Sequence, residues 1–203
     1  MERSARRRLT LAPALSVTAV ALMAAAGLVA AQPAGNPSAP TTSAPAADPL
    51  ADEDYRKGQD FLQKQNYAEA MRAYRGAAAR GNAPAQYGIG DLYATGEGVP
   101  KDYREAMRWF GLAAAQGNSL AQGNVGIFYV MGMGVSQDYK EGMKWLRKAA
   151  DQGNEVAQRN IGFMYFKGLG VAPDRAEAIR WFRMAAENGD DEAKEGLKEL
   201  RVK

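Results

Sequence analysis

Residues 103–117 read YREAMRWFGLAAAQG, and the same pattern returns at 139–153 as YKEGMKWLRKAADQG and at 175–189 as RAEAIRWFRMAAENG. The only tryptophans of the chain share this spacing of 36 residues: Trp109, Trp145 and Trp181. A period of about 20 to 50 residues is typical of a solenoid, in which each unit buries its apolar face only against its neighbours. The sequence therefore predicts a stack of similar structural units.

Glycine, asparagine and aspartate divide each unit into two helices. Gly-Asn occurs at 81–82, 117–118 and 153–154, where the glycine suits a left-handed helix end and the asparagine suits the N-cap of the next helix. The first helices, expected at about 83–95, 119–131 and 155–167, each stop at a Gly-x-Gly-Val loop. The second helices follow an aspartate that stands three residues before a glutamate, the spacing of a reciprocal capping box: Asp102, Asp138 and Asp174. We therefore predict an all-α domain of nine helices from about 51 to 201, paired in antiparallel hairpins.

These motifs resemble the SEL-like repeats, a subfamily of the tetratricopeptide solenoids. The resemblance rests on the A-x-x-x-Ile/Val-Gly-x-x-Tyr stretch, the Gly-x-Gly-Val loop and the Trp-Phe/Leu-x-x-Ala-Ala block of units 82–117, 118–153 and 154–189. It implies an α/α solenoid of stacked antiparallel helix hairpins, with the first helix of each unit on the concave side. The unit 51–81 departs from the pattern, because Gly58 and Ala70 are 12 residues apart where the later units have 16. It resembles an ordinary tetratricopeptide unit, and the polar segment 190–203 is expected to be a capping helix.

Composition excludes several kinds of enzyme. The 203-residue chain has no His and no Cys, which excludes Ser-His-Asp and Cys-His nucleophile systems, thiol redox chemistry and His/Cys zinc sites. The Asp/Glu pairs that begin the second helices recur in every unit, so we interpret them as helix caps rather than acid–base pairs. We expect no catalytic residue, no cofactor and no metal.

The net charge belongs to the N-terminus. The formal charge of +3 arises within the first eight residues, and from Gln32 onward 22 basic residues balance 22 acidic ones. A neutral body gives no electrostatic footprint for a phosphate backbone, so nucleic acid is not an expected partner.

The basic N-terminus has the layout of a bacterial export signal. Three arginines at 6–8 precede an uncharged stretch from Leu9 to Ala31, which ends with Val29 and Ala31 at the −3 and −1 positions of a cleavage site. The stretch is also long enough to span a bilayer, so a retained anchor is the alternative to a cleaved signal peptide at 1–31 and the only membrane attachment expected. Either outcome places the rest of the chain outside the cytoplasm, in the periplasm, the cell envelope or the medium.

A spacer separates this signal from the repeats. Residues 32–50 contain five prolines among small residues, with one charge and no aromatic side chain. Such a segment cannot bury a core, so we predict that it is disordered and fairly extended. The remaining residues, 51–203, are the right number for one domain.

In a repeat protein we expect function at the positions that differ between units. Packing between units requires similar residues in every unit, whereas binding a partner does not. The three first helices differ most at columns 87/123/159, 91/127/163 and 94/130/166. Given the implied concave position, these columns predict a peptide-sized groove with an apolar floor of Ile127, Val130, Phe163 and Phe166, edged by Tyr55, Tyr87, Asp91 and Arg159. The alternative is that the bulkier residues fill a tighter inner curve.

Two functions remain open. The first is an exported protein–protein interaction module, an adaptor or regulator that binds a peptide or protein partner through the concave face. The second is a small carbohydrate- or peptidoglycan-directed enzyme that uses an unrepeated carboxylate pair such as Asp91 with Glu97. The second requires that two such carboxylates converge in one pocket with raised pKa values.

Overall fold

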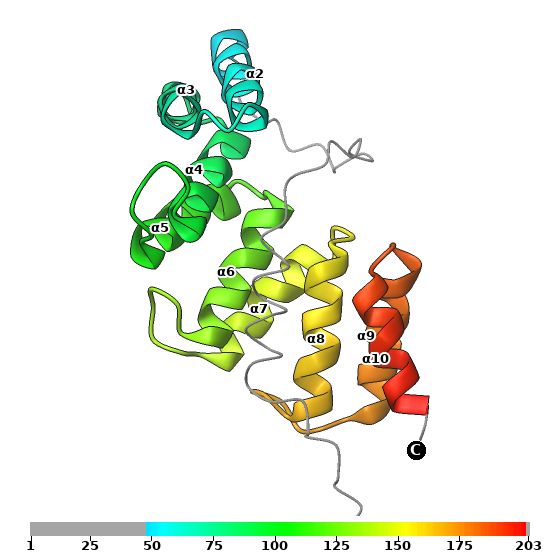
Figure 1. Ribbon diagram of the computed structural model, residues 1–203. Coiled ribbons are helices and arrows are strands. Elements are labelled where there is room, and N and C mark those ends of the chain that lie inside the picture. Colours follow the sequence, from blue (N-terminus) through cyan, green and yellow to red (C-terminus); the bar gives the residue numbers. More distant parts are fainter. Residues whose placement is uncertain (1–47, 202–203) are drawn as a thin grey trace, which may run out of the picture.

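The computed structural model describes residues 48–201, and within this range nine helices follow one another without a strand (Figure 1). They are α2 (Pro49–Gln63), α3 (Tyr67–Ala79), α4 (Ala83–Thr95), α5 (Tyr103–Ala115), α6 (Ser119–Met131), α7 (Tyr139–Ala150), α8 (Glu155–Lys167), α9 (Arg175–Glu187) and α10 (Asp191–Arg201). Hairpins α2–α3, α4–α5, α6–α7 and α8–α9 stack in chain order, and α10 packs on α9. The predicted all-α solenoid is confirmed. The predicted export signal and residues 32–47 of the predicted spacer lie outside the described residues.

The first helix begins earlier than predicted. Asp48 accepts a hydrogen bond from the backbone N–H of Leu50 at 3.0 Å, and Pro49 occupies the first helical position. Proline is favoured there because its fixed φ suits a helix and its missing N–H would be unpaired anyway. The prediction that residues 49–50 belong to a disordered spacer is therefore wrong.

The Gly-Asn pairs behave as predicted. Gly81, Gly117 and Gly153 have positive φ angles of 84°, 89° and 85°. The asparagine side chain that follows each of them accepts a hydrogen bond from a backbone N–H three residues on, at 2.8 to 2.9 Å. An N-cap of this kind stabilises a helix by about 1 kcal/mol. Each dipeptide thus ends one unit and starts the next.

The aspartate caps form, but the reciprocal half of the predicted capping box is wrong. Asp102 accepts hydrogen bonds from the backbone N–H groups of Arg104 and Glu105 at 2.9 and 3.1 Å. Its own N–H donates to the carbonyl of Tyr93 at 2.9 Å, so the glutamate has no donor to bind. Glu105 forms a surface ion pair with Arg108 instead. Asp138 and Asp174 repeat this arrangement.

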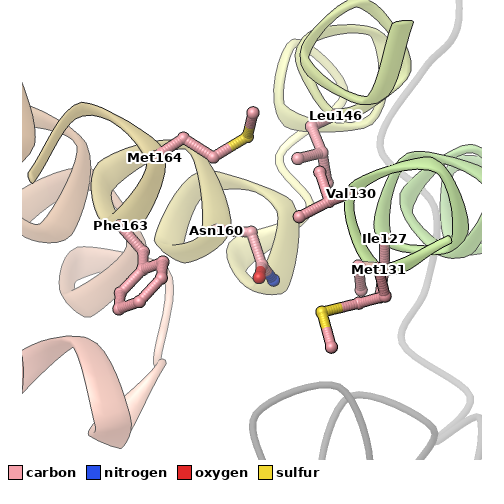
Figure 2. A pocket seen from close by; sticks show the side chains of 7 residues that line it. All are labelled: Ile127, Val130, Met131, Leu146, Asn160, Phe163 and Met164. Atoms are coloured by element: carbon pink, nitrogen blue, oxygen red, sulfur yellow. The ribbon is translucent and has the colours of Figure 1, made fainter. Parts of the chain in front are cut away.

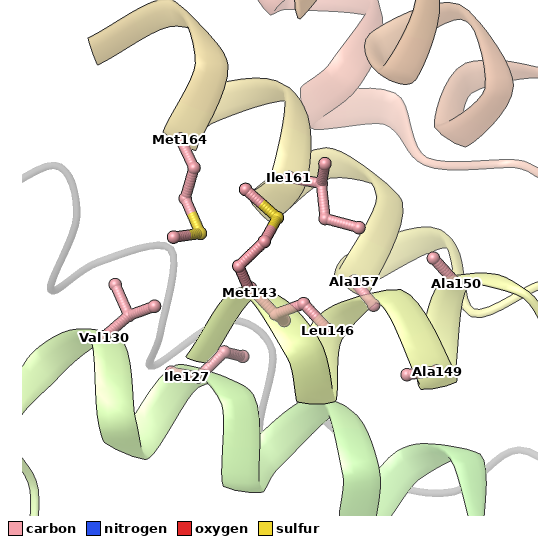
Figure 3. Close-up of a cluster of buried hydrophobic side chains, with 9 residues drawn as sticks. All are labelled: Ile127, Val130, Met143, Leu146, Ala149, Ala150, Ala157, Ile161 and Met164. Atoms are coloured by element: carbon pink, nitrogen blue, oxygen red, sulfur yellow. The ribbon is translucent and has the colours of Figure 1, made fainter. Parts of the chain in front are cut away.

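Within a hairpin, a glycine on the first helix receives a large side chain from the second. A Cβ on Gly126 would lie 2.7 Å from Cγ of Leu146, so only glycine allows this approach. Gly90 with Phe110 repeats the contact. Figure 3 shows the core that results where α6, α7 and α8 meet, with Leu146 and Ile161 fully buried. Each such side chain contributes about 1.5 to 3 kcal/mol through burial.

Amide side chains join neighbouring units. Gln116 donates to Gln86 at 2.7 Å, and Gln152 donates to Gln122 at the same distance. Asn188 repeats the bond one unit later. These bonds satisfy polar groups that the stacking of units removes from water, so they select one register of stacking.

Candidate functional site

The first helices α2, α4, α6 and α8 lie along one side of the stack and carry three hollows in a row. The first hollow, between α2, α3 and α4, has a volume of about 250 Å³. The second lies between α4, α6 and α8 and has about 20 Å³, and the third lies between α6, α7 and α8 and has about 10 Å³. Tyr87 lines both the first and the second hollow, and Ile127 lines both the second and the third. The three hollows are therefore neighbours, separated by the side chains of Tyr87 and Ile127.

Three tyrosines surround the first hollow: Tyr55, Tyr74 and Tyr87. The ring of Tyr74 lies between Gly58 on α2 and Gly88 on α4, where a Cβ would come within 2.4 and 2.8 Å of its atoms. Tyr55 stacks on Tyr74 with ring centroids 5.8 Å apart. The two glycines thus fix the position of Tyr74 in the wall.

Asp91 supplies the only charge among the described residues that line the first hollow. Its Oδ1 atom is buried and has no hydrogen-bond donor within residues 48–201. Burial raises the pKa of Asp91 to about 7, and the negative charge of Glu97 adds to the shift. Burial also raises the pKa of the phenols of Tyr55, Tyr74 and Tyr87. The hollow therefore holds three neutral phenols around one carboxyl group.

The first and third hollows occupy equivalent positions in two different units. Each lies between the two helices of one hairpin and the first helix of the next hairpin. The third is lined by Met131, Leu146, Asn160 and Phe163, among others, and Figure 2 shows these side chains converging from α6, α7 and α8. Their equivalents in the first hollow are Gln63, Tyr74, Gly88 and Asp91. The large ring of Phe163 is replaced by a short carboxylate and Asn160 by glycine, so the first hollow stays open.

The predicted apolar floor is mostly buried. Ile127, Val130 and Phe163 have only 5, 8 and 6% of their surface exposed, because the first two pack in the core between α6, α7 and α8 (Figure 3) and Phe163 packs in the core that α8 forms with α9 and α10. The prediction that these three form an exposed floor is wrong, and they fill the inner curve instead. Phe166 is 37% exposed, with the ammonium of Lys167 5.0 Å from its ring centroid.

Arg159 is also not an edge of the groove. It is 4% exposed and forms a buried ion pair with Asp190, with Glu192 3.3 Å away at the surface. Asp190 stands in the N-cap column of the asparagines and caps α10 by accepting from the N–H of Ala193. One unit earlier the same two positions hold Gly123 and Asn154. Arg159 and its ion-pair partner Asp190 therefore occur together, and both are absent from the equivalent positions of the preceding unit.

The sequence predicted Tyr55, Tyr87 and Asp91 as edges of a groove, and all three line the first hollow, but the sequence analysis missed Tyr74. The signal was the shortened first unit: Gly58 and Gly90 align at 32 residues rather than 36. With that offset Tyr55 and Tyr87 share one column, and the glycine column of the first helices faces Tyr74, Phe110 and Leu146 in turn. Aligning the first unit with this offset therefore identifies Tyr74 as the large side chain that lines the hollow together with Asp91.

The carboxylate pair that the enzyme hypothesis requires does not converge in the hollow. Glu97 belongs to the loop after α4, is exposed and accepts a hydrogen bond from the hydroxyl of Tyr67 at 3.3 Å. It does not line the hollow that contains Asp91. Over residues 48–201, no group of three or more acidic side chains is placed to hold a metal ion.

Stacked antiparallel helix hairpins of this kind define a helical repeat solenoid. The Sel1 repeat model matches residues 83–118, 119–154 and 156–190, which is more than half of the chain, and the chain belongs to the Sel1 repeat family. The Sel1 repeat fold generally mediates protein–protein interaction, and solenoids of this family are typically scaffolds without enzymatic activity.

Two solved structures share this fold. A Sel1 repeat protein from Oxalobacter formigenes is 33% identical with a TM-score of 0.68, covering 72% of this chain and 62% of its own. A protective antigen of uropathogenic Escherichia coli strains, which displays an SLR fold, is 39% identical with a TM-score of 0.67, covering 70% of this chain and 32% of its own. The chain thus spans less than two thirds of either relative.

No curated protein matches the chain significantly. None of the helices in residues 48–201 is long and apolar enough to cross a membrane.

Proposed function

We propose that the protein is an exported interaction module, an adaptor or regulator, which binds a segment of a partner protein along the inner face formed by α2, α4, α6 and α8. The observation that supports this proposal is the row of neighbouring hollows along these helices, with Tyr87 and Ile127 each lining two of them. A row of this kind suits an extended segment that inserts a side chain into the first hollow and lies across the other two, which have room for no more than about one water molecule each. The open first hollow supplies the largest site for a side chain.

The second hollow offers a polar contact suited to a peptide backbone. Asn124 lines it, and its buried Nδ2 atom has no acceptor in good hydrogen-bond geometry among residues 48–201, although its side chain is close enough to the Tyr87 hydroxyl to offset part of the rise that burial causes in the pKa of that phenol. A buried donor without a partner is unfavourable by about 1 to 3 kcal/mol, so a partner carbonyl that accepts from it would gain affinity. Leu120 contributes an exposed apolar edge beside it.

Export is part of the proposal and rests on the sequence alone. Arginines at 6–8, the uncharged stretch and the small residues before position 32 support export to the periplasm or medium. A fusion of residues 1–50 to a reporter enzyme that is active only outside the cytoplasm tests this part. Replacing the three arginines should abolish the activity, and an inactive fusion that stays in the cytoplasm would contradict export.

Site-specific photo-crosslinking in the full-length chain tests the binding face. Exposed apolar residues provide a matched set: Leu120 and Phe166 on first helices are 40 and 37% exposed, and Leu112 and Met184 on second helices are 43 and 41% exposed. We expect a photoreactive residue at either of the first two positions to capture one partner, which mass spectrometry identifies. Capture of that partner from Leu112 or Met184 with none from the inner face would refute the proposal.

A further inference from the structure

We propose that the hollow between α2, α3 and α4 binds a lysine or arginine side chain of the partner segment, with Asp91 facing its cationic head and Tyr55, Tyr74 and Tyr87 around it. This inference rests on the proposed function and adds the chemistry of the recognised side chain.

The negative charge of Asp91 favours a cationic group as the occupant of the hollow. Asp91 is the only charged side chain of the described residues in the hollow, and none of the ion pairs within residues 48–201 includes it. Its Oδ1 atom also lacks a donor there. An ammonium or guanidinium group supplies both a charge and N–H donors. An apolar occupant would leave the carboxylate unpaired, and an anion would be repelled by Asp91 and by nearby Glu97.

The tyrosines favour the same occupant. Aromatic faces attract cations through their negative quadrupole, and cages of several rings are a known way to bind ammonium groups. Tyr55 and Tyr74 are stacked, and Tyr87 joins the wall from α4. The rings also provide apolar surface for the methylene groups of a long cationic side chain.

The size fits a side chain that enters from the groove. A cavity of about 150 Å³ is enough to hold benzene, so the 250 Å³ of this hollow admits the end of a lysine or arginine. The equivalent third hollow, which Phe163 lines, has a volume of only about 10 Å³. Because the second hollow lies directly beyond Tyr87 on the same side of the stack, the cation is expected on a peptide that lies across both hollows rather than as a free small molecule.

Nuclear magnetic resonance titration of the full-length chain tests the inference at about pH 8, where Asp91 is ionised. The probes are acetylated and amidated glycine pentapeptides whose central residue is lysine, arginine, norleucine or glutamate, with tetramethylammonium chloride as the free cation. We expect the lysine or arginine peptide to shift the backbone amide signal of Gly88 in a saturable manner and the norleucine and glutamate peptides to bind about tenfold more weakly or not at all.

Two variants refine the test. Asp91→Asn keeps the shape of the side chain and should weaken the cationic peptide about tenfold. Asp60→Asn removes an exposed carboxylate of α2 that lies outside the hollow and should change the affinity less than about twofold. The peptide comparison on the unmodified chain stands even if one variant does not fold.

The possible outcomes separate the two proposals. Equal binding of the norleucine peptide or no saturable shift at Gly88 would overturn the cationic site. Tighter binding of tetramethylammonium than of the lysine peptide would overturn the claim that the cation is a peptide side chain. If the inner face still captures a partner through Leu120 and Phe166, the proposed function survives that result. Selective lysine or arginine binding without any inner-face capture would retain the cationic site and overturn the proposed function.

Discussion

Replacing Asp91 by asparagine should change how stability depends on pH. In the folded chain burial raises the pKa of Asp91 from 3.8 to about 7, with a further contribution from Glu97, and in the unfolded chain the ordinary value returns. The folded state therefore binds the proton more tightly. The stabilisation by protonation is complete below about pH 4, and it is lost as the pH rises toward 7.

The magnitude follows from the shift. At about 1.36 kcal/mol for each pKa unit, a shift of this size corresponds to roughly 4 kcal/mol of unfolding free energy between about pH 4 and pH 8. Asparagine has nearly the same shape and does not titrate, so Asp91→Asn should lack this loss. The unfolding free energy of the variant minus that of the unmodified chain should therefore rise by roughly 4 kcal/mol as the pH increases from about 4 to about 8.

Urea unfolding followed by the helical circular dichroism signal at several pH values measures this difference. Taking the difference between the two proteins cancels the titration of the exposed carboxylates that they share. Asp60→Asn, an exposed carboxylate on α2, serves as the control and should give a nearly constant difference. If the difference for Asp91→Asn is also constant between about pH 4 and pH 8, the carboxyl group is solvated in the folded chain and the reasoning about the hollow fails.

Three further changes test the inner face and the turns. Phe163→Ala should destabilise the chain by about 3 to 5 kcal/mol in urea unfolding because the ring is buried, whereas Phe166→Ala should cost less than about 1 kcal/mol; equal losses would contradict the different burial. Asp190→Asn should cost about 3 kcal/mol because it leaves Arg159 without its buried partner, and adding Arg159→Gly, which restores the pair found one unit earlier, should recover part of that loss in thermal melts. Gly153→Val should cost about 1 kcal/mol or more since its φ is +85° with no neighbour to clash, and Gly153→Asn should cost clearly less; similar melting temperatures for both variants would show that backbone strain is not the cause.

Because helices and their ends depend on local spacing, the sequence was sufficient for the helices and for most of their ends, though not for the start of α2. The 36-residue period places the hairpins, and the Gly-Asn pairs and aspartate caps act within three residues of a helix start. The repeat columns also led us to expect Tyr55, Tyr87 and Asp91 along one groove, and all three line the first hollow.

Whether a residue on that face is open or buried was decided only by the tertiary structure. Ile127 and Phe163 are covered because side chains from other units fill the inner curve, while Asp91, in the same column, borders an open hollow because Gly88 and the short carboxylate leave space. Arg159 finds its partner 31 residues away. Periodicity specifies the direction in which a side chain points, but its exposure depends on how closely neighbouring helices approach and on which side chains they carry there.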